Sequence, residues 1–264
     1  MNDVVYLYGI VPVDAPAPPA DLTGVSNATV ELLQLGAAAA VVGRLPADVY
    51  RADLVESRLD DLAWVGEQGM AHERVVLWFV DHTDILPARL FSLYSDDAAL
   101  LAALEPQRPG IARTFAALGG RREWNLKVAY DADLLGRHGS DISTELRRMD
   151  QEMASAPPGR RYLMERRRAD MLGREVAAAA HRLARELLEA LQRHAEDIRV
   201  LPLAGVDTGG TVVLSAALLV PRACEAALRE EAESRERALG DIGMIISFSG
   251  PWAPYRFMDD APNG

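Results

Sequence analysis

The second half of the chain arranges its apolar patterns in an order that few folds share. Alternating side chains in EWNLKVAY, residues 123–130, predict a strand, and two stretches with helical spacing follow it. The order strand, helix pair, strand, strand, helix, strand is that of a ferredoxin-like βαββαβ sandwich, here with an enlarged first crossover. The predicted elements are strands at 123–130, 198–204, 211–220 and 242–249 and helices at 142–153, 162–197 and 221–240.

Glycine and proline punctuate this half of the chain. GVDTGG, residues 205–210, suits a hairpin turn between the two middle strands. Pro221 is expected to open the last helix as its first-turn proline, and Gly240 is expected to end that helix.

The first half mixes strands and helices in a less regular order. The apolar run VVYLYGIV predicts a buried strand, and RVVLWFV predicts another. A helix interrupted by two prolines is expected to stop at Gly119-Gly120. The predicted strands are 4–11, two segments around Gly36 that close at Pro46, and 74–80, and the predicted helices are 48–73 and 97–120, the latter broken around Pro106 and Pro109.

These patterns predict a two-domain α+β protein. We place an N-terminal α+β domain at 1–120 and a modified ferredoxin-like domain with a long helical crossover at 121–250. An aromatic and proline-rich tail follows at 251–264.

The composition narrows the class of protein. A net charge of −11 argues against binding nucleic acid or anionic membranes through overall charge, because phosphate affinity comes largely from lysine and arginine. The apolar runs are much shorter than the roughly 20 residues that a membrane span needs, and the N-terminus is not typical of a signal peptide. A single cysteine, Cys224, excludes an intramolecular disulfide and fits a reducing compartment. We therefore expect a cytoplasmic protein.

The sequence offers no catalytic or metal-binding pattern. Its five histidines lack the spacing of a helical zinc site, and HExxH, CxxC and G-x-S-x-G motifs are absent. His72 and His82 flank the predicted strand 74–80, where we expect half-buried loop positions. No catalytic, cofactor or metal residue is assigned, and the protein is not expected to be an enzyme. We expect a protein that acts by binding other proteins, and the alternative is a cytoplasmic ferredoxin-like module that binds a ligand or has a regulatory role.

Six arginines lie between residues 160 and 174 of this acidic chain. One interpretation is a solvated helix face held by i, i+4 pairs such as Asp170–Arg174. The functional interpretation is a patch for an acidic partner protein, because guanidinium groups form bidentate contacts with carboxylates. Arg166, Arg167 and Arg168 are the candidate partner-binding residues.

The end of the chain, FSGPWAPYRF, concentrates aromatic residues and prolines. Two prolines remove backbone donors, so the tail is not expected to continue the last strand inside a sheet. Trp252, Tyr255 and Phe257 carry apolar area that is costly to leave in water. We expect this tail to pack on its own protein near the domain boundary, with docking onto another protein as the alternative.

Five motifs together resemble one family, the gas vesicle accessory proteins of the GvpL/GvpF type. The motifs keep the family's order and cover most of the chain, and the final one departs from Gly-Pro-Trp-Pro-Pro-Tyr-x-Phe only at Ala253. They are YLYGI at 6–10, HERVVLWFVDHTDILPARLFSLYSD at 72–96, EWNLKVAYD at 123–131, PPGRRYLMERRR at 157–168 and GPWAPYRF at 250–257.

The resemblance implies a non-enzymatic protein that takes part in gas vesicle assembly or shell structure. Such proteins are located in the gas vesicle within the cytoplasm. The implied partners are the small hydrophobic shell protein and other accessory proteins, and the implied fold has a modified ferredoxin-like second domain.

One segment departs from the family pattern. Where the family reads close to Leu-Pro-Leu-Arg-Phe-Gly-Thr, this chain has LPARLFSLYSD. Leu86, Pro87 and Arg89 keep the frame, but the Phe-Gly pair is displaced and the glycine is absent. A partner contact through this loop would therefore differ here.

Overall fold

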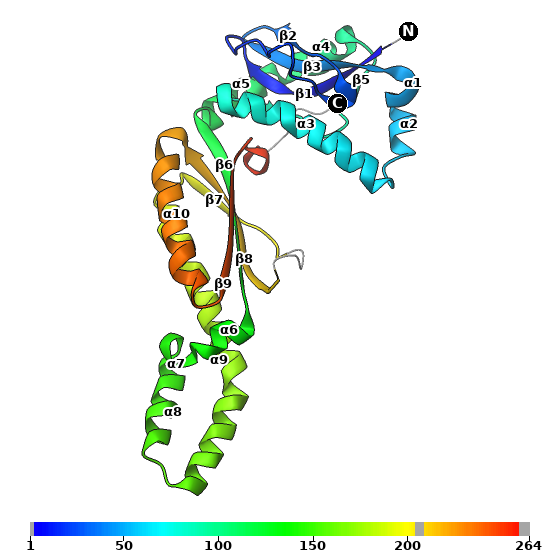
Figure 1. Ribbon diagram of the computed structural model, residues 1–264. Coiled ribbons are helices and arrows are strands. Elements are labelled where there is room, and N and C mark those ends of the chain that lie inside the picture. Colours follow the sequence, from blue (N-terminus) through cyan, green and yellow to red (C-terminus); the bar gives the residue numbers. More distant parts are fainter. Residues whose placement is uncertain (1–2, 204–208, 259–264) are drawn as a thin grey trace. The chain divides into compact units, whose positions relative to one another are not determined.

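The structure, a computed structural model, describes residues 3–203 and 209–258 (Figure 1). The chain divides into two compact units: Met1–Glu123 together with Pro251–Gly264, called unit 1, and Trp124–Gly250, called unit 2. Each unit is described by itself.

Unit 1 contains short helices, one long helix and the strands of the first sheet. Its elements are β1 (Asp3–Pro12), η1 (Val25–Asn27), β2 (Val30–Leu35), β3 (Ala38–Pro46), α1 (Ala47–Tyr50), α2 (Ala52–Glu56), α3 (Leu62–His82), β4 (Leu86–Pro87), β5 (Leu93–Tyr94), α4 (Asp97–Leu104), η2 (Glu105–Gln107), α5 (Arg108–Leu118) and the tail turn η4 (Tyr255–Phe257).

The second sheet and its helices make up most of the remaining chain. The elements are β6 (Arg121–Tyr130), α6 (Ala132–Arg137), α7 (Gly139–Ile142), α8 (Thr144–Ala154), α9 (Pro158–Gln192), β7 (Asp197–Val200), β8 (Thr211–Pro221), η3 (Arg222–Cys224), α10 (Glu225–Gly240) and β9 (Met244–Trp252). The first and last strands of this sheet, β6 and β9, each extend a few residues beyond the bounds of unit 2.

Strand β1 lies at the centre of the first sheet. It pairs antiparallel with β3 on one side and with β4 and β5 on the other, and β2 extends the sheet beyond β3. Burial from Val5 to Val11 explains why this strand reads as a continuous apolar run. Gly9 sits at a shift of register, and a Cβ there would approach the Leu86 carbonyl oxygen to 2.7 Å. Glycine therefore allows β1 and β4 to lie close together.

The predicted strand 74–80 is wrong, because these residues belong to helix α3. Asp61 caps the helix by accepting a hydrogen bond from the Trp64 N–H at 3.1 Å. The buried positions Val75, Val76, Phe79 and Val80 recur at helical spacing, which the continuous apolar run conceals. His72 and His82 consequently lie on one helix rather than in loops at the two ends of a strand.

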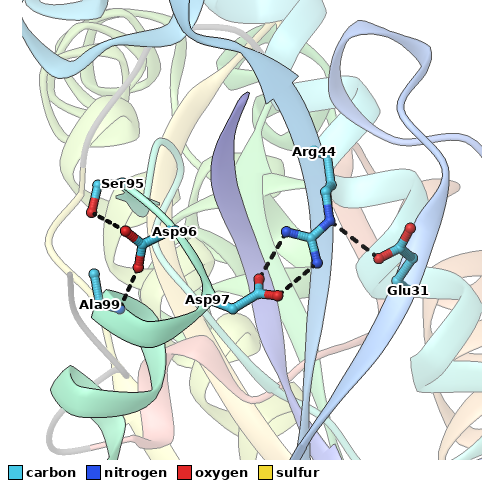
Figure 2. A network of polar contacts seen from close by, with 6 residues as sticks. All are labelled: Glu31, Arg44, Ser95, Asp96, Asp97 and Ala99. Atoms are coloured by element: carbon cyan, nitrogen blue, oxygen red, sulfur yellow. Dashed lines mark hydrogen bonds and ion pairs between the residues drawn. The ribbon is translucent and has the colours of Figure 1, made fainter. Parts of the chain in front are cut away.

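A polar network ties α4 to the sheet of unit 1 (Figure 2). The Arg44 guanidinium on β3 donates to both Asp97 oxygens at 2.8 and 2.9 Å and lies 3.4 Å from Glu31 on β2. Asp96 caps α4 by accepting from the Ala99 N–H at 2.8 Å. The Arg44 guanidinium lowers the pKa of the Asp97 carboxyl through this hydrogen bonding. The contacts are solvent-exposed, so they add little to the stability of unit 1. They do hold the first turn of α4 against strand β3.

The core of unit 2 lies between its sheet and the helices α9 and α10. The strands are ordered β7-β8-β6-β9. Alternate residues of β6, Trp124, Leu126 and Val128, are buried in this core. Helix α9 contributes Val176, Ala180, Ala184, Leu187 and Leu191, which all lie on one face.

Helix α9 is 35 residues long, and only its second half packs on the sheet. Its first part runs beside α8 as a helical hairpin that extends beyond the strands of this unit (Figure 1). Leu146 and Met149 of α8 are buried, and Ser143 donates to Glu175 of α9 at 2.7 Å. We call α8 and the first part of α9 the α8–α9 hairpin.

Three local predictions concern two prolines, Pro221 and Pro251, and the turn at 205–210. Pro221 ends β8, and α10 begins only at Glu225 after a 3-10 turn, so the expected first-turn proline is wrong. Strand β9 continues through Pro251 to Trp252, which an edge strand of the sheet tolerates because it needs no donor on its outer side. The predicted turn at 205–210 falls largely outside the described residues.

Candidate functional site

The part of the chain that the structure describes holds no group of three or more histidine, cysteine or acidic residues placed to bind a metal ion. Among the same residues, no helix is long and apolar enough to cross a membrane.

The Tyr6 hydroxyl and His72 Nδ1 form a buried hydrogen bond of 2.8 Å that joins β1 to α3. Burial lowers the pKa of His72 to about 4 and raises that of Tyr6. The Tyr6 oxygen also accepts from the Phe91 N–H at 3.3 Å. Because both rings are closed off from solvent, we interpret this pair as a structural link between elements.

The tail is held in unit 1 by two carboxylates. The Tyr255 hydroxyl donates to Glu73 Oε2 at 3.0 Å, and burial raises the pKa of Glu73. The Arg256 N–H donates to Glu123 Oε2 at 2.9 Å, while its guanidinium pairs with the other oxygen of the same carboxylate. Glu123 is only 1% exposed. We call these contacts of Tyr255 and Arg256 the tail latch.

The tail also buries apolar side chains. Ala253 is fully buried in the core of unit 1, and Phe257 is 6% exposed. Trp252, the largest side chain of the motif, is only half-buried. The tail therefore packs within unit 1 mainly through the residues after Trp252.

Sequence reasoning missed both acidic residues of the tail latch. Glu73 is the last residue of the predicted helix 48–73, and Glu123 opens the predicted strand EWNLKVAY directly after two arginines. Neither position carries a local signal of burial, because each carboxylate is buried by a tail more than 130 residues away in sequence.

The three candidate arginines of α9 have different surroundings. Arg168 donates to both Asp150 oxygens at 2.6 and 3.1 Å and lowers the pKa of that carboxyl, so it joins the two helices of the hairpin. Arg166 and Arg167 are exposed. Arg167 acts electrostatically on Glu145, whereas Arg166 makes no ion pair with the described residues. Of the three candidates, Arg166 and Arg167 are therefore the ones exposed to a partner.

The departing segment LPARLFSLYSD has an unusual backbone. Counted from Leu86, the glycine of the family pattern falls at Phe91, and Phe91 adopts a positive φ of 63°. Its ring stacks on Trp64 with centroids 5.2 Å apart and planes 6° from parallel. The Arg58 guanidinium lies 4.1 Å from the Trp64 ring centre. Phe91 thus adopts a backbone conformation that favours glycine, and its side chain stacks on Trp64.

We expect Phe91→Gly to be less destabilising than Phe91→Ala, by about 1 kcal/mol in the free energy of unfolding. Both changes remove the stacked ring, but only glycine also relieves the positive φ. Chemical denaturation of the two variants beside the unaltered chain measures this difference. An alanine variant at least as stable as the glycine variant would contradict the strained conformation.

Unit 1 also has an open cavity between the β2–β3 turn and helix α5, lined mostly by apolar residues and on one side by the ion pair of Glu105 and Arg108. Its volume is approximately 630 Å³. Leu35, Ala38, Ile111 and Phe115 supply apolar walls, and the exposed Ala112 lies at its lining. The neighbouring strand β2 is an edge of the sheet. The cavity is large enough to receive apolar side chains of another molecule.

These features define a mixed α/β protein built from two units, each with its own sheet. The family model described as gas vesicle synthesis protein GvpL/GvpF matches residues 4–259. The chain belongs to this family, which confirms the resemblance and gives the protein a role in gas vesicles.

Curated relatives agree with this assignment. Gas vesicle protein L from Streptomyces sp. (strain CB03234) is 29% identical over 238 residues, which cover 89% of this chain and 85% of that protein. Gas vesicle protein F from the same strain is 26% identical over 262 residues, or 96% of this chain and 99% of that protein.

Solved structures show the same fold. The crystal structure of the gas vesicle protein GvpF from Anabaena sp. PCC7120 has a TM-score of 0.68 at 19% identity, covering 98% of this chain and 99% of that chain. GvpF from Microcystis aeruginosa gives a TM-score of 0.66 at 19% identity, with coverages of 98% and 100%. The mixed α/β architecture therefore matches that of GvpF.

Proposed function

We propose that this protein is a non-enzymatic factor in gas vesicle assembly or shell structure. It acts in the gas vesicle, within the cytoplasm, by binding the hydrophobic shell protein and other accessory proteins. The family match over residues 4–259 is the observation that carries this proposal. A strongly apolar shell subunit aggregates in water unless a partner covers its surface, and covering it requires apolar contacts rather than a catalytic site.

We further propose that unit 2 is a modified ferredoxin-like domain. Its element order from β6 to β9 supports this assignment, since helices separate the first and second strands and the third and fourth strands. The enlarged first crossover consists of α6 to α9, which includes the α8–α9 hairpin.

The cavity of unit 1 is our candidate for the contact with the shell protein. Its apolar walls and its position beside the edge strand β2 support this choice, because an edge strand and an apolar pocket together can hold an extended apolar segment. We also propose that the tail residues Trp252, Tyr255 and Phe257 pack on their own protein and stabilise unit 1, and that they do not dock onto another protein.

A co-purification experiment with the shell protein tests this proposal. Ala112→Arg fills the mouth of the cavity from an exposed helical position, so the fold is retained. We expect at least about tenfold weaker capture of the shell protein, which corresponds to roughly 1.4 kcal/mol. Ala117→Arg, an equally exposed position on the same helix outside the cavity lining, is the matched control.

The outcomes separate the two parts of the proposal. Equal capture by the Ala112→Arg variant and the unaltered chain would exclude the cavity as the contact. No capture by the unaltered chain under assembly conditions would exclude shell protein binding itself.

A further inference from the structure

We infer that the exposed face of the α8–α9 hairpin binds an acidic, amphipathic helical segment of a partner protein. This hairpin face consists of Arg160, Tyr162, Leu163, Arg166 and Arg167 on α9. It lies in unit 2, and it does not depend on the contact proposed between unit 1 and the shell protein.

The hairpin leaves one side of α9 uncovered. Arg168 faces α8 and binds Asp150 there, so α8 covers that side of the helix. At 100° per residue, Tyr162, Leu163, Arg166 and Arg167 lie together on the opposite side. All four are exposed, and Tyr162 with Arg166 and Leu163 with Arg167 are neighbours at i, i+4 spacing.

Two large apolar side chains lie between Arg160 and Arg166 along this face. Tyr162 is 63% exposed and Leu163 is 66% exposed. Two adjacent apolar residues on the outer side of a surface helix do not contribute to any core. Tyrosine and arginine are enriched among residues that dominate binding energy in protein interfaces. The face therefore has the composition of an interface rather than of a solvated helix.

The arginines of this face have few acidic partners among the described residues. Asp170 and Arg174 form no i, i+4 ion pair in the described part of the chain, contrary to the simpler interpretation of this stretch. Arg160 and Arg166 likewise make no ion pair with a described residue, and Arg167 is only near Glu145. The three guanidinium groups thus give a local positive charge on a chain whose net charge is −11.

Charge complementarity selects the occupant. Guanidinium groups form bidentate hydrogen bonds with carboxylates, so aspartate and glutamate side chains match the rim of this face. Tyr162 and Leu163 match leucine-type side chains at helical spacing, as in recognition of an amphipathic helix. A helical partner segment that carries glutamates beside an apolar stripe therefore matches both the arginines and the apolar side chains of this face.

A designed peptide provides the probe. We suggest a fluorescein-labelled helix of about 20 residues, long enough to be helical, with leucine along one face and glutamate elsewhere. Fluorescence anisotropy measures its binding to the full chain. We expect saturable binding that weakens as salt rises, and at least about tenfold weaker binding to the variant with Arg166→Glu and Arg167→Glu. Tyr162→Ala is expected to weaken binding at least about fivefold at every salt concentration.

A double variant with Arg185→Glu and Arg237→Glu is the matched control. Both positions are exposed in unit 2 and give the same change of net charge, but Arg185 lies about 30 Å along α9 from the hairpin face. This variant should bind the peptide like the unaltered chain. Circular dichroism melting of every variant verifies that the hairpin is folded before binding is compared.

Four results would overturn the inference. They are absence of saturable binding to the unaltered chain, equal weakening by the control variant, equally tight binding of a peptide with lysine in place of glutamate, and arginine-dependent binding to phosphatidylserine vesicles without peptide binding. A concentration-dependent dimer that is lost with Arg166→Glu and Arg167→Glu would instead assign the face to a second copy of this chain.

Discussion

Replacing Phe257 by alanine is expected to lower the free energy of unfolding of unit 1 by about 3–5 kcal/mol. The ring is only 6% exposed, and its removal leaves a void in the tail packing of unit 1. Denaturant unfolding followed by circular dichroism measures the loss. Trp252→Ala is expected to cost less, because that side chain is half-buried and part of its surface is already in water.

Met70→Ala is the control for this prediction. Met70 lies on α3 in the same unit, but its side chain is 67% exposed, so its loss should change stability by less than about 0.5 kcal/mol. An equal cost for Phe257→Ala and Met70→Ala would mean that the tail does not stabilise unit 1.

Replacing Arg256 by methionine is expected to destabilise unit 1 by about 3 kcal/mol. Glu123 is almost fully buried and accepts two hydrogen bonds from Arg256, one from the backbone and one from the guanidinium. Without the guanidinium, the Glu123 carboxylate remains buried without its counter-charge, which costs far more than the loss of an exposed ion pair.

A second substitution tests this explanation. Glu123→Gln keeps an acceptor for the Arg256 N–H and removes the charge. The variant with both Glu123→Gln and Arg256→Met should therefore be more stable than Arg256→Met alone, as measured by denaturant midpoints. If the second change lowers stability further, the cost does not come from a buried uncompensated carboxylate.

Local patterns were enough to predict much of the fold. The central strand β1, the β2–β3 pair around Gly36, the proline break between α4 and α5, and the long helix α9 all correspond to predictions. Each is specified by nearby residues: apolar runs, turn glycines or a single apolar helix face. The mixed α/β architecture follows from these elements and matches the solved GvpF structures.

The failures arise where two local signals compete or where a contact joins separate segments. RVVLWFV contains β-branched and aromatic residues that suit a strand, yet the Asp61 cap and the spacing of Val75, Val76 and Phe79 place it in a helix. The positive φ of Phe91 also could not be predicted, because the stack on Trp64 that accompanies it joins two separate segments.

The candidate surfaces were predicted unevenly. The sequence identified Arg166 and Arg167, which are exposed, but grouped them with Arg168, which is engaged by Asp150. It identified the tail aromatics, but neither Glu73, which accepts from Tyr255, nor the contact of Arg256 with Glu123. Clusters of charged or aromatic residues can be recognised in a sequence. Which residue each of them contacts depends on the fold.

The tail latch has a consequence for biosynthesis. Glu123 and Glu73 leave the ribosome long before Tyr255 and Arg256, because all of unit 2 is translated between them. Domains generally fold as units during synthesis, from the N-terminus onward. Unit 1 cannot complete its structure in that order, since its tail segment is translated only after all of unit 2. A chain that stops before Tyr255 therefore yields a first unit in which Glu73 and Glu123 lack their partners from the tail.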